Sequence, residues 1–306
     1  MSYTITGLDA KLQDYLSVNK DQLITDTIFN SKTSKLFNVQ TGVKNPTAIV
    51  RLDSTIVLDD LGCSFNPQGS DTFTNRILTP NFVTVNKVYC DKDLINSWKA
   101  TDVKISATAE SLPFEQQILE KNADLISAEI EKLLWVGDVQ NGAGNMAKAD
   151  GVYTLAKREI ASGVIPASNV TAKGSDSVFE RVQKMWLALP ANVADKVTFV
   201  TSITNYKQMI VDLMNANMYH IFEEYNGEYR MRLPFCNNEI MGIEGLEGVD
   251  TIMGVIFDEL YYGVDLEGDS EDVDFFYDKS DRNFKYVCNF VIATQYAFPE
   301  HIFINE

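Results

Sequence analysis

A helical repeat of apolar residues between positions 112 and 136 constrains the fold more than any other feature of this sequence. These residues recur at steps of three and four, the spacing of one helix face, at Phe114, Ile118, Leu119, Ala123, Ile126, Ile130, Leu133 and Leu134. Pro113 suits the first turn of such a helix, and Gly137 suits its C-cap. The pattern predicts a single rod of roughly 23 residues, about 35 Å long. A loop at 138–150 and a short strand at 152–155 are predicted to follow it.

The segment before this helix, residues 46–110, has the texture of β-strands. It is rich in Thr, Val, Ile and Asn, with short apolar–polar alternations such as the one at 81–85. Turn signals at Asn66-Pro67 and Thr79-Pro80 interrupt it. A long excursion of this kind has little core of its own and exposes sheet edges. We therefore expect it to pair with another surface.

Residues 176–260 are typical of a compact α/β unit. A helix is predicted from Val178 to Pro190, and a buried strand at 197–201 follows it. Ser202 is then positioned to cap a second helix that extends to Met214. The order helix–strand–helix places both helices against a small sheet. Strand texture returns in residues 261–306, so the predicted fold class is α+β.

Charge limits the classes of function. The formal net charge of −17, from 43 acidic and 26 basic residues, argues against a protein whose main task is binding nucleic-acid phosphates. The acidic residues are concentrated in 250–281, whereas residues 1–51 are slightly basic. Two interpretations stay open: an N-terminal arm that lies on the acidic body of a neighbouring copy, and a solvated surface with uneven charge.

The four cysteines, Cys63, Cys90, Cys236 and Cys288, form no C-x-x-C pair, so we expect reduced thiols in a cytoplasmic product. The N-terminus shows no basic segment followed by an apolar one, and no signal peptide is expected. No apolar run approaches the roughly 18 residues that cross a bilayer, so no membrane partner is expected.

Several motif matches lack the context that their chemistry requires. Residues 142–147 fit G-x-G-x-x-A, but they follow the predicted helix instead of joining a strand to a helix. The acidic stretch 265–272 is similar to a calcium loop, but its glycine is fourth instead of sixth, which favours a solvated turn. Residues 17–20 fit S-x-x-K without its companion motifs. The only histidines are His220 and His301, which leaves few general bases near neutral pH. We expect no catalytic residue, cofactor or metal ion.

The order of these segments resembles the Hong Kong 97-type major capsid proteins of tailed bacteriophages. Residues 130–138 (IEKLLWVGD) and 149–153 (ADGVY) resemble the family's helix end, glycine-rich loop and return strand. The ending 293–300 (ATQYAFPE) resembles its closing strand, which often finishes on an aromatic–proline step. No single motif is strongly specific, so the order over nearly the whole chain carries the resemblance.

The resemblance implies an α+β capsid fold with five parts. Residues 1–45 would form the N-terminal arm and 46–110 the extended β-loop. Residues 111–175 would form the peripheral domain with its long spine helix, and 176–258 the inserted axial α/β domain. Residues 259–306 would complete the peripheral domain with a closing β-segment.

The resemblance also implies a function. The subunit would self-assemble into hexamers and pentamers of an icosahedral shell that encloses phage double-stranded DNA. It would be made and assembled in the bacterial cytoplasm and end in the virion. Its partners would be other copies of the chain, a portal, and DNA bound without sequence specificity, with cement proteins left open. No scaffolding region fits before the spine helix, so a separate scaffolding protein is expected. No Lys–Asn cross-link is expected.

Two residues of the extended loop, Phe73 and Arg76, are the ones that we expect to contact a neighbouring subunit. The substitution Arg76→Glu should then leave the subunit folded but impair assembly.

Three alternatives remain open at this point. An encapsulin-type shell around a protein cargo would share the fold. Another virion protein, such as a tail or adhesion protein, would have more β-structure than the two helices at 178–214 allow. A divalent-metal-dependent enzyme would use the acids at 258–274 and would lose stability or activity without metal.

Overall fold

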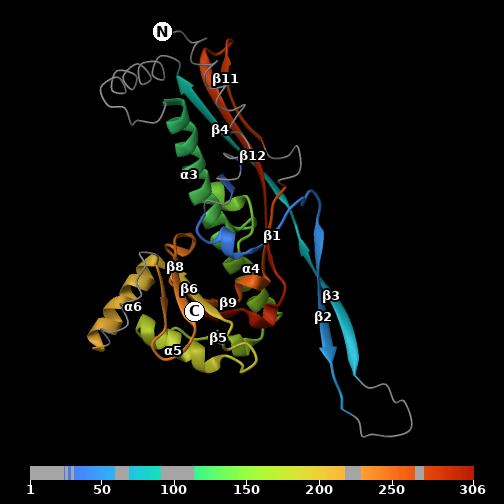
Figure 1. The fold of residues 1–306 in the computed structure, drawn as a ribbon, viewed down its shortest axis with the longest axis vertical. Helices are drawn as coiled ribbons and strands as arrows, with labels where there is room; N and C mark the ends of the chain where they lie inside the picture. Colours follow the sequence, from blue (N-terminus) through green and yellow to red (C-terminus); the bar gives the residue numbers. More distant parts are fainter. Residues whose placement is uncertain are drawn as a thin grey trace.

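The computed structural model describes residues 24, 27–28, 31–58, 69–90, 114–217, 229–265 and 272–306. Three parts are visible in Figure 1: a long narrow sheet with a helix beside it, a compact α/β unit, and a two-stranded hairpin that projects away from both. Helices and strands keep the labels of that figure.

The predicted rod is confirmed as helix α3, Phe114–Val136. Its apolar face, from Leu119 to Trp135, lies in the larger hydrophobic core. Gly137 ends the helix, and its N–H donates to the carbonyl of Leu133 at 3.2 Å. Gly151 lies so close to the helix end that an added Cβ would be 2.4 Å from the carbonyl carbon of Trp135. The helix end and the chain after the loop are therefore in direct backbone contact.

The predicted strand at 152–155 is wrong, because these residues begin helix α4, Val152–Ser162. Four apolar or β-branched residues are too short a run to distinguish a strand from a helix turn. The following Ala, Lys, Arg and Glu are good helix formers. Gly163 then ends the helix in the left-handed conformation, with φ 77°.

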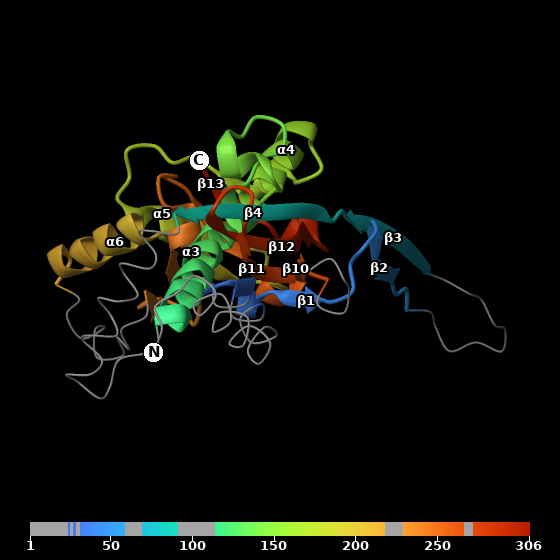
Figure 2. The same cartoon turned by 90° about the horizontal axis from the view of Figure 1, so that it is seen from above.

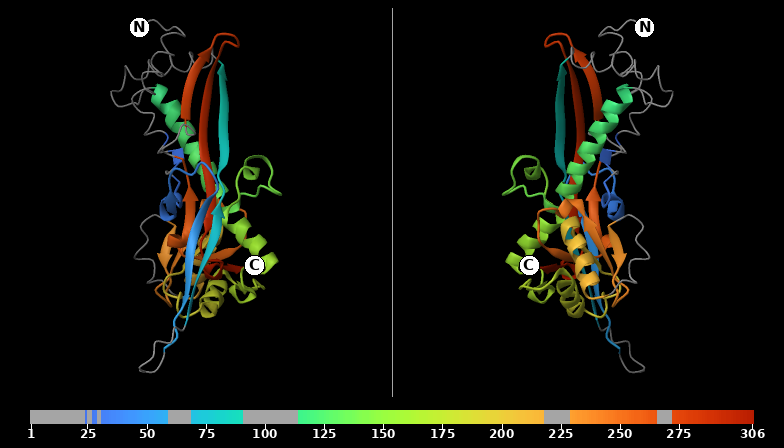
Figure 3. Two further views of the ribbon diagram at one scale, coloured as in Figure 1. Left: turned by 90° about the vertical axis from the view of Figure 1, so that its right-hand side faces the viewer. Right: turned by 90° about the vertical axis from the view of Figure 1, so that its left-hand side faces the viewer.

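The long sheet is built around β12, Asn283–Tyr296. β4 (Asn81–Cys90) pairs antiparallel with Asn283–Ile292 of β12, and β11 (Asp272–Asp278) pairs antiparallel with Asn283–Asn289 on the opposite side. β10 (Leu260–Gly263) pairs with its last four residues, and β1 (Asn38–Gln40) adds to β10 in parallel. Figures 2 and 3 show α3 and α4 on different sides of this sheet. Residues 81–90, which belong to the predicted β-excursion, are thus part of the long sheet.

The compact unit matches its prediction closely. Helices α5 (Val178–Ala188) and α6 (Ile203–Asn215) and the strand β6 (Thr198–Ser202) are confirmed. Ser202 caps α6 by accepting the N–H of Asn205 at 3.1 Å. The sheet has the order β5 (Val170–Thr171), β13 (Phe303–Asn305), β9 (Ile252–Val255), β6, β8 (Glu239–Ile243) and β7 (Arg230–Arg232). Both helices bury their apolar faces in a second core.

The described part of the predicted arm packs on its own chain. Phe37 is buried, with its ring 5.7 Å from that of Trp135. Trp135 Nε1 donates to Thr33 Oγ1 at 2.9 Å, and that hydroxyl donates to Glu131 at 2.7 Å. Phe37 and Val43 of this segment are therefore buried against their own chain. Residues 1–23 of the predicted arm lie outside the described residues.

Candidate interaction surface

Among the described residues, the projecting hairpin has the least support from its own chain. It consists of β2 (Thr47–Thr55) and β3 (Ser70–Leu78), which form a separate two-stranded sheet. Figures 1 and 3 show it extending well beyond the body. An isolated two-stranded ribbon is at best marginally stable in water. Its side chains therefore decide how it is held and what it can contact.

One face of the hairpin is apolar and exposed. Leu52 is directly opposite Phe73, and their side chains are 52% and 69% exposed. Val50 and Ile77, on the same face, are 62% and 58% exposed. We call these four residues the outer stripe. Exposed apolar side chains gathered on one face are a feature of surfaces that bind other proteins.

The opposite face of the hairpin is fixed to the body. Ile49 and Leu78 are buried there in a small cluster with Val43, Ala293 and Ala297. Arg51 lies 5.0 Å above the ring of Phe298 and forms a 2.9 Å ion pair with Glu300. The root of the hairpin is thus packed, and its direction is set by the chain itself.

Arg76 is the second arginine of this face. It forms an ion pair with Glu159 of α4, donates to Gln295 at 2.9 Å, and lies 4.5 Å from the ring centroid of Tyr296. The Tyr296 hydroxyl donates to the other oxygen of Glu159 at 2.6 Å. Burial, with the adjacent Glu159 carboxylate, raises the pKa of Tyr296 above its usual value, so the phenol stays a donor.

The two residues predicted to contact a neighbour thus lie on opposite faces. Phe73 is on the exposed outer stripe, whereas the Arg76 side chain is only 15% exposed and is engaged within its own chain. Their spacing of three residues places them on opposite faces of any strand. The same alternation could have identified Val50, Leu52 and Ile77, which sequence reasoning missed. Contacts of Phe73 and Arg76 across subunits stay a prediction.

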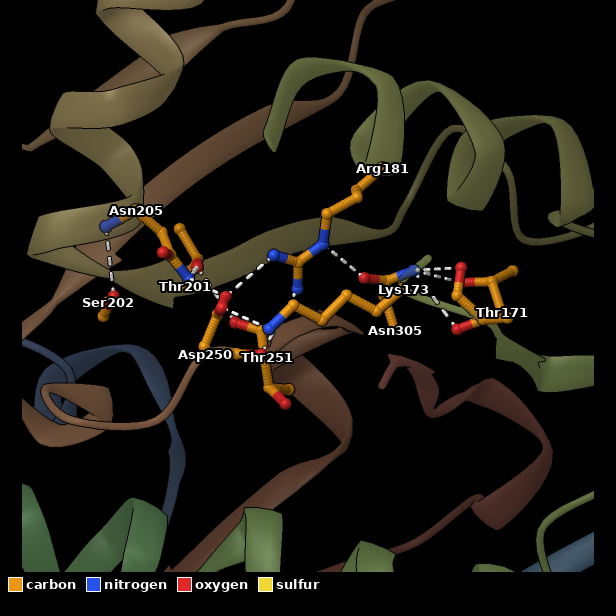
Figure 4. Close-up of polar contacts among 10 residues, drawn as sticks. Thr171, Lys173, Arg181, Thr201, Ser202, Asn205, Asp250, Thr251 and Asn305 are labelled. Atoms are coloured by element: carbon orange, nitrogen blue, oxygen red, sulfur yellow. Dashed lines mark hydrogen bonds and ion pairs between the residues drawn. The ribbon is translucent and has the colours of Figure 1, made fainter. Parts of the chain in front are cut away.

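A second polar site ties α5 to the C-terminal strand (Figure 4). The guanidinium of Arg181, 3% exposed, donates to Asp250 at 2.8 Å and to Asn305 Oδ1 at 2.6 Å. Lys173 also pairs with Asp250, and the two cations lower the pKa of that carboxyl to about 2. A pocket of about 420 Å³ lies beside the cluster. Because Arg181 joins Asp250 to Asn305 of the C-terminal strand, the arrangement is that of a structural joint.

Groups that could support chemistry are few in the described part of the chain. No group of three or more His, Cys, Asp or Glu residues there could hold a metal ion. His301 Nδ1 pairs with Glu259 at 2.8 Å. Residues 142–147 follow α3 and precede α4, away from any strand-to-helix turn. His220 and most of the acidic stretch 265–272 lie outside the described residues.

No described helix combines the length and the apolar character needed to cross a bilayer.

Neither a protein-family model nor a curated protein sequence matches the chain. Solved structures do match. A chain from the procapsid of satellite phage P4 with its size determination (Sid) protein has 11% identity and a TM-score of 0.65, over 99% of this chain and 98% of that one. A chain of Mycobacterium phage Bobi has 12% identity and a TM-score of 0.59, covering 90% and 89%. One from the capsid of an empty GTA particle has 10% identity and a TM-score of 0.56, also covering 90% and 89%. The resemblance is confirmed at the level of the fold: this chain has the Hong Kong 97-like fold of phage capsid proteins.

Proposed function

We propose that this chain is the major capsid protein of a tailed phage, a subunit that assembles into hexamers and pentamers of an icosahedral shell around double-stranded DNA. The observation that carries the proposal is the outer stripe of Val50, Leu52, Phe73 and Ile77 on a hairpin held away from the body. The fold shared with phage capsid proteins over nearly the whole chain supports it.

The outer stripe supplies a physical reason for assembly. Each of its side chains is more than half exposed in the single subunit. Burying the exposed parts of all four on a neighbour would contribute on the order of 4 kcal/mol per hairpin. A contact of this size is weak for one pair of subunits. A closed symmetric shell repeats it for every subunit, so the assembly is far more durable than any pair.

The remaining parts follow the same proposal. The described arm and the α5–α6 unit would contact neighbours within a ring, with the α5–α6 unit at its centre. A portal and a separate scaffolding protein would take part in assembly, and cement proteins stay open. Assembly would take place in the cytoplasm of the bacterial host.

Negative-stain electron microscopy of the purified chain, alone and with a candidate scaffolding protein, tests the proposal. We expect closed shells, rings of five and six, or regular tubes. Nuclease-resistant DNA in particles from infected cells would separate a phage shell from an encapsulin-type shell around protein cargo. A chain that stays monomeric when concentrated and supplied with scaffold would overturn the proposal.

A further inference from the structure

Three elements of this acidic protein bring basic side chains to one aromatic ring. Lys32, in the N-terminal arm, and Lys207 of α6 each place their ammonium group 5.6 Å from the ring centroid of Tyr229. β7 begins at the next residue and presents Arg230 and Arg232 on its exposed side, with Met231 buried between them. We call Lys32, Lys207, Arg230 and Arg232 the basic patch.

The position of the ring is determined by packing. Tyr229 lies 6.0 Å from the buried Tyr206 in an edge-on arrangement, and its carbonyl accepts the N–H of Gly242 at 2.6 Å. A Cβ at Gly242 would be 2.8 Å from the Cβ of Tyr206 and 3.2 Å from that of Tyr229, so the close packing of both tyrosines favours glycine there. The ring is thus a fixed platform for two flexible lysines.

Most of the positive charge in the patch has no acidic partner among the described residues. Arg230 is paired with Glu239 across the strands. Arg232 donates to the amide oxygen of Asn237, which carries no charge. Lys32 and Lys207 contact the ring and form no ion pair within the described part of the chain, although Lys32 lines a pocket with Asp124, Glu131 and Glu244. By contrast, Arg51, Arg158 and Lys285 each pair with carboxylates.

The open edge of the sheet adds neutral donors to this positive charge. β7 pairs only with β8 and is the last strand of its sheet among the described residues. Backbone N–H groups on an unpaired edge can donate to phosphate oxygens, as can lysine and arginine side chains. None of these groups reads a base sequence, so the ligand that fits is a phosphodiester backbone of any sequence.

We propose that the basic patch binds the phosphate backbone of the enclosed double-stranded DNA, and that the side of the body carrying Lys32 and β7 therefore faces the shell interior. This inference rests on the proposed capsid function and adds to it a surface and an orientation. A small patch on a protein of net charge −17 would touch DNA locally without holding it tightly, as a genome that is packaged and later ejected requires.

Fluorescence anisotropy of a short labelled DNA duplex, titrated with the full chain at several salt concentrations, tests the proposal. We expect weak binding that decreases with salt. The double variant Lys32→Glu, Lys207→Glu should bind at least about tenfold more weakly and reduce the slope of log K against log salt by about 2. Arg232→Gln alone should reduce that slope by about 1.

The matched control is Lys148→Glu, Lys279→Glu, which makes the same change in net charge at two exposed lysines elsewhere. An equal loss in this control would show that only total charge matters and would overturn the proposal. A wild-type chain that does not bind the duplex would also overturn the proposal. So would a wild-type chain that binds poly-glutamate as tightly as it binds the duplex, because the ligand would then be an acidic protein segment. If the Lys32→Glu, Lys207→Glu variant still forms shells, the proposed capsid function stands. If the wild-type chain forms no shells, that function is overturned whatever the DNA result.

Discussion

The guanidinium of Arg76 in β3 lies over the ring of Tyr296 in β12, 4.5 Å from its centroid. The contact joins the projecting hairpin to the central strand of the long sheet. Glu159 of α4 accepts from both residues, so three elements meet at this point. Because the other anchor, Arg51, lies further along the same face, the hairpin is held at two places and cannot pivot about one.

Replacing Arg76 with Ala should lower the free energy of unfolding by about 1–3 kcal/mol, because Gln295 and the partly buried Glu159 lose a charged donor. Arg76→Glu should cost more, since it places two carboxylates together. Urea unfolding measures the loss, and limited proteolysis should show faster cleavage in the hairpin. Lys148→Ala, at an exposed site, should change neither. Unaltered stability of Arg76→Ala would mean that the hairpin does not depend on this anchor.

Phe73→Ser should impair assembly and leave stability unchanged, whereas Arg76→Ala should lower stability. The Phe73 side chain is 69% exposed, so the free energy of unfolding should stay within about 0.5 kcal/mol of the wild type. Shell formation, followed by electron microscopy and light scattering, should decrease strongly because the outer stripe loses its largest member. Leu187→Ser, at a 75% exposed residue of α5, serves as the control. Normal shells from Phe73→Ser would remove the outer stripe from the assembly contacts.

Thr33→Val should loosen the arm from α3. It removes the hydroxyl that accepts from Trp135 Nε1 and donates to the buried Glu131, at a cost of about 1–3 kcal/mol. Thr33→Ser keeps the hydroxyl and should lose much less. Thermal unfolding distinguishes the two, and equal losses would mean that the methyl group, not the hydroxyl, matters at this position.

Asp250→Asn should destabilise the protein at neutral pH, because Arg181 is then buried without a charged partner. The two cations lower the pKa of Asp250 to about 2 in the folded state, against an ordinary value of 3.8. A lowered carboxyl pKa contributes stability that is present above the ordinary pKa and is lost as pH falls through the folded one. Because the Asp250 side chain is 53% exposed, screening reduces this contribution to about 1 kcal/mol.

Urea unfolding between pH 5 and pH 2 checks the linkage at Asp250. The stability difference between wild type and Asp250→Asn should shrink as pH falls from about 4 towards 2. A difference that stays constant over this window would show that the carboxylate charge is not what stabilises the joint.

Local pattern was a good guide to single elements and a poor guide to their partners. Helices α3 and α5 and the Ser202 cap of α6 were predicted because helix periodicity and capping involve residues three or four apart. Residues 152–155 were assigned to a strand because their local pattern is short and ambiguous, although they begin α4. The predicted excursion 46–110 includes β4, whose pairing with β12 no local pattern indicates.

By itself the sequence determined the helical rod, the capped helix–strand–helix unit, the strand texture around them and the order that resembles a capsid protein. Only the tertiary structure decided that Arg76 faces inward to Tyr296 while Phe73 faces outward, that Arg181 joins Asp250 and Asn305, and that Lys32 and Lys207 share one ring. The physical reason is that these contacts join segments far apart in the chain. No local propensity selects such partners, because their geometry exists only once the sheets and helices have packed.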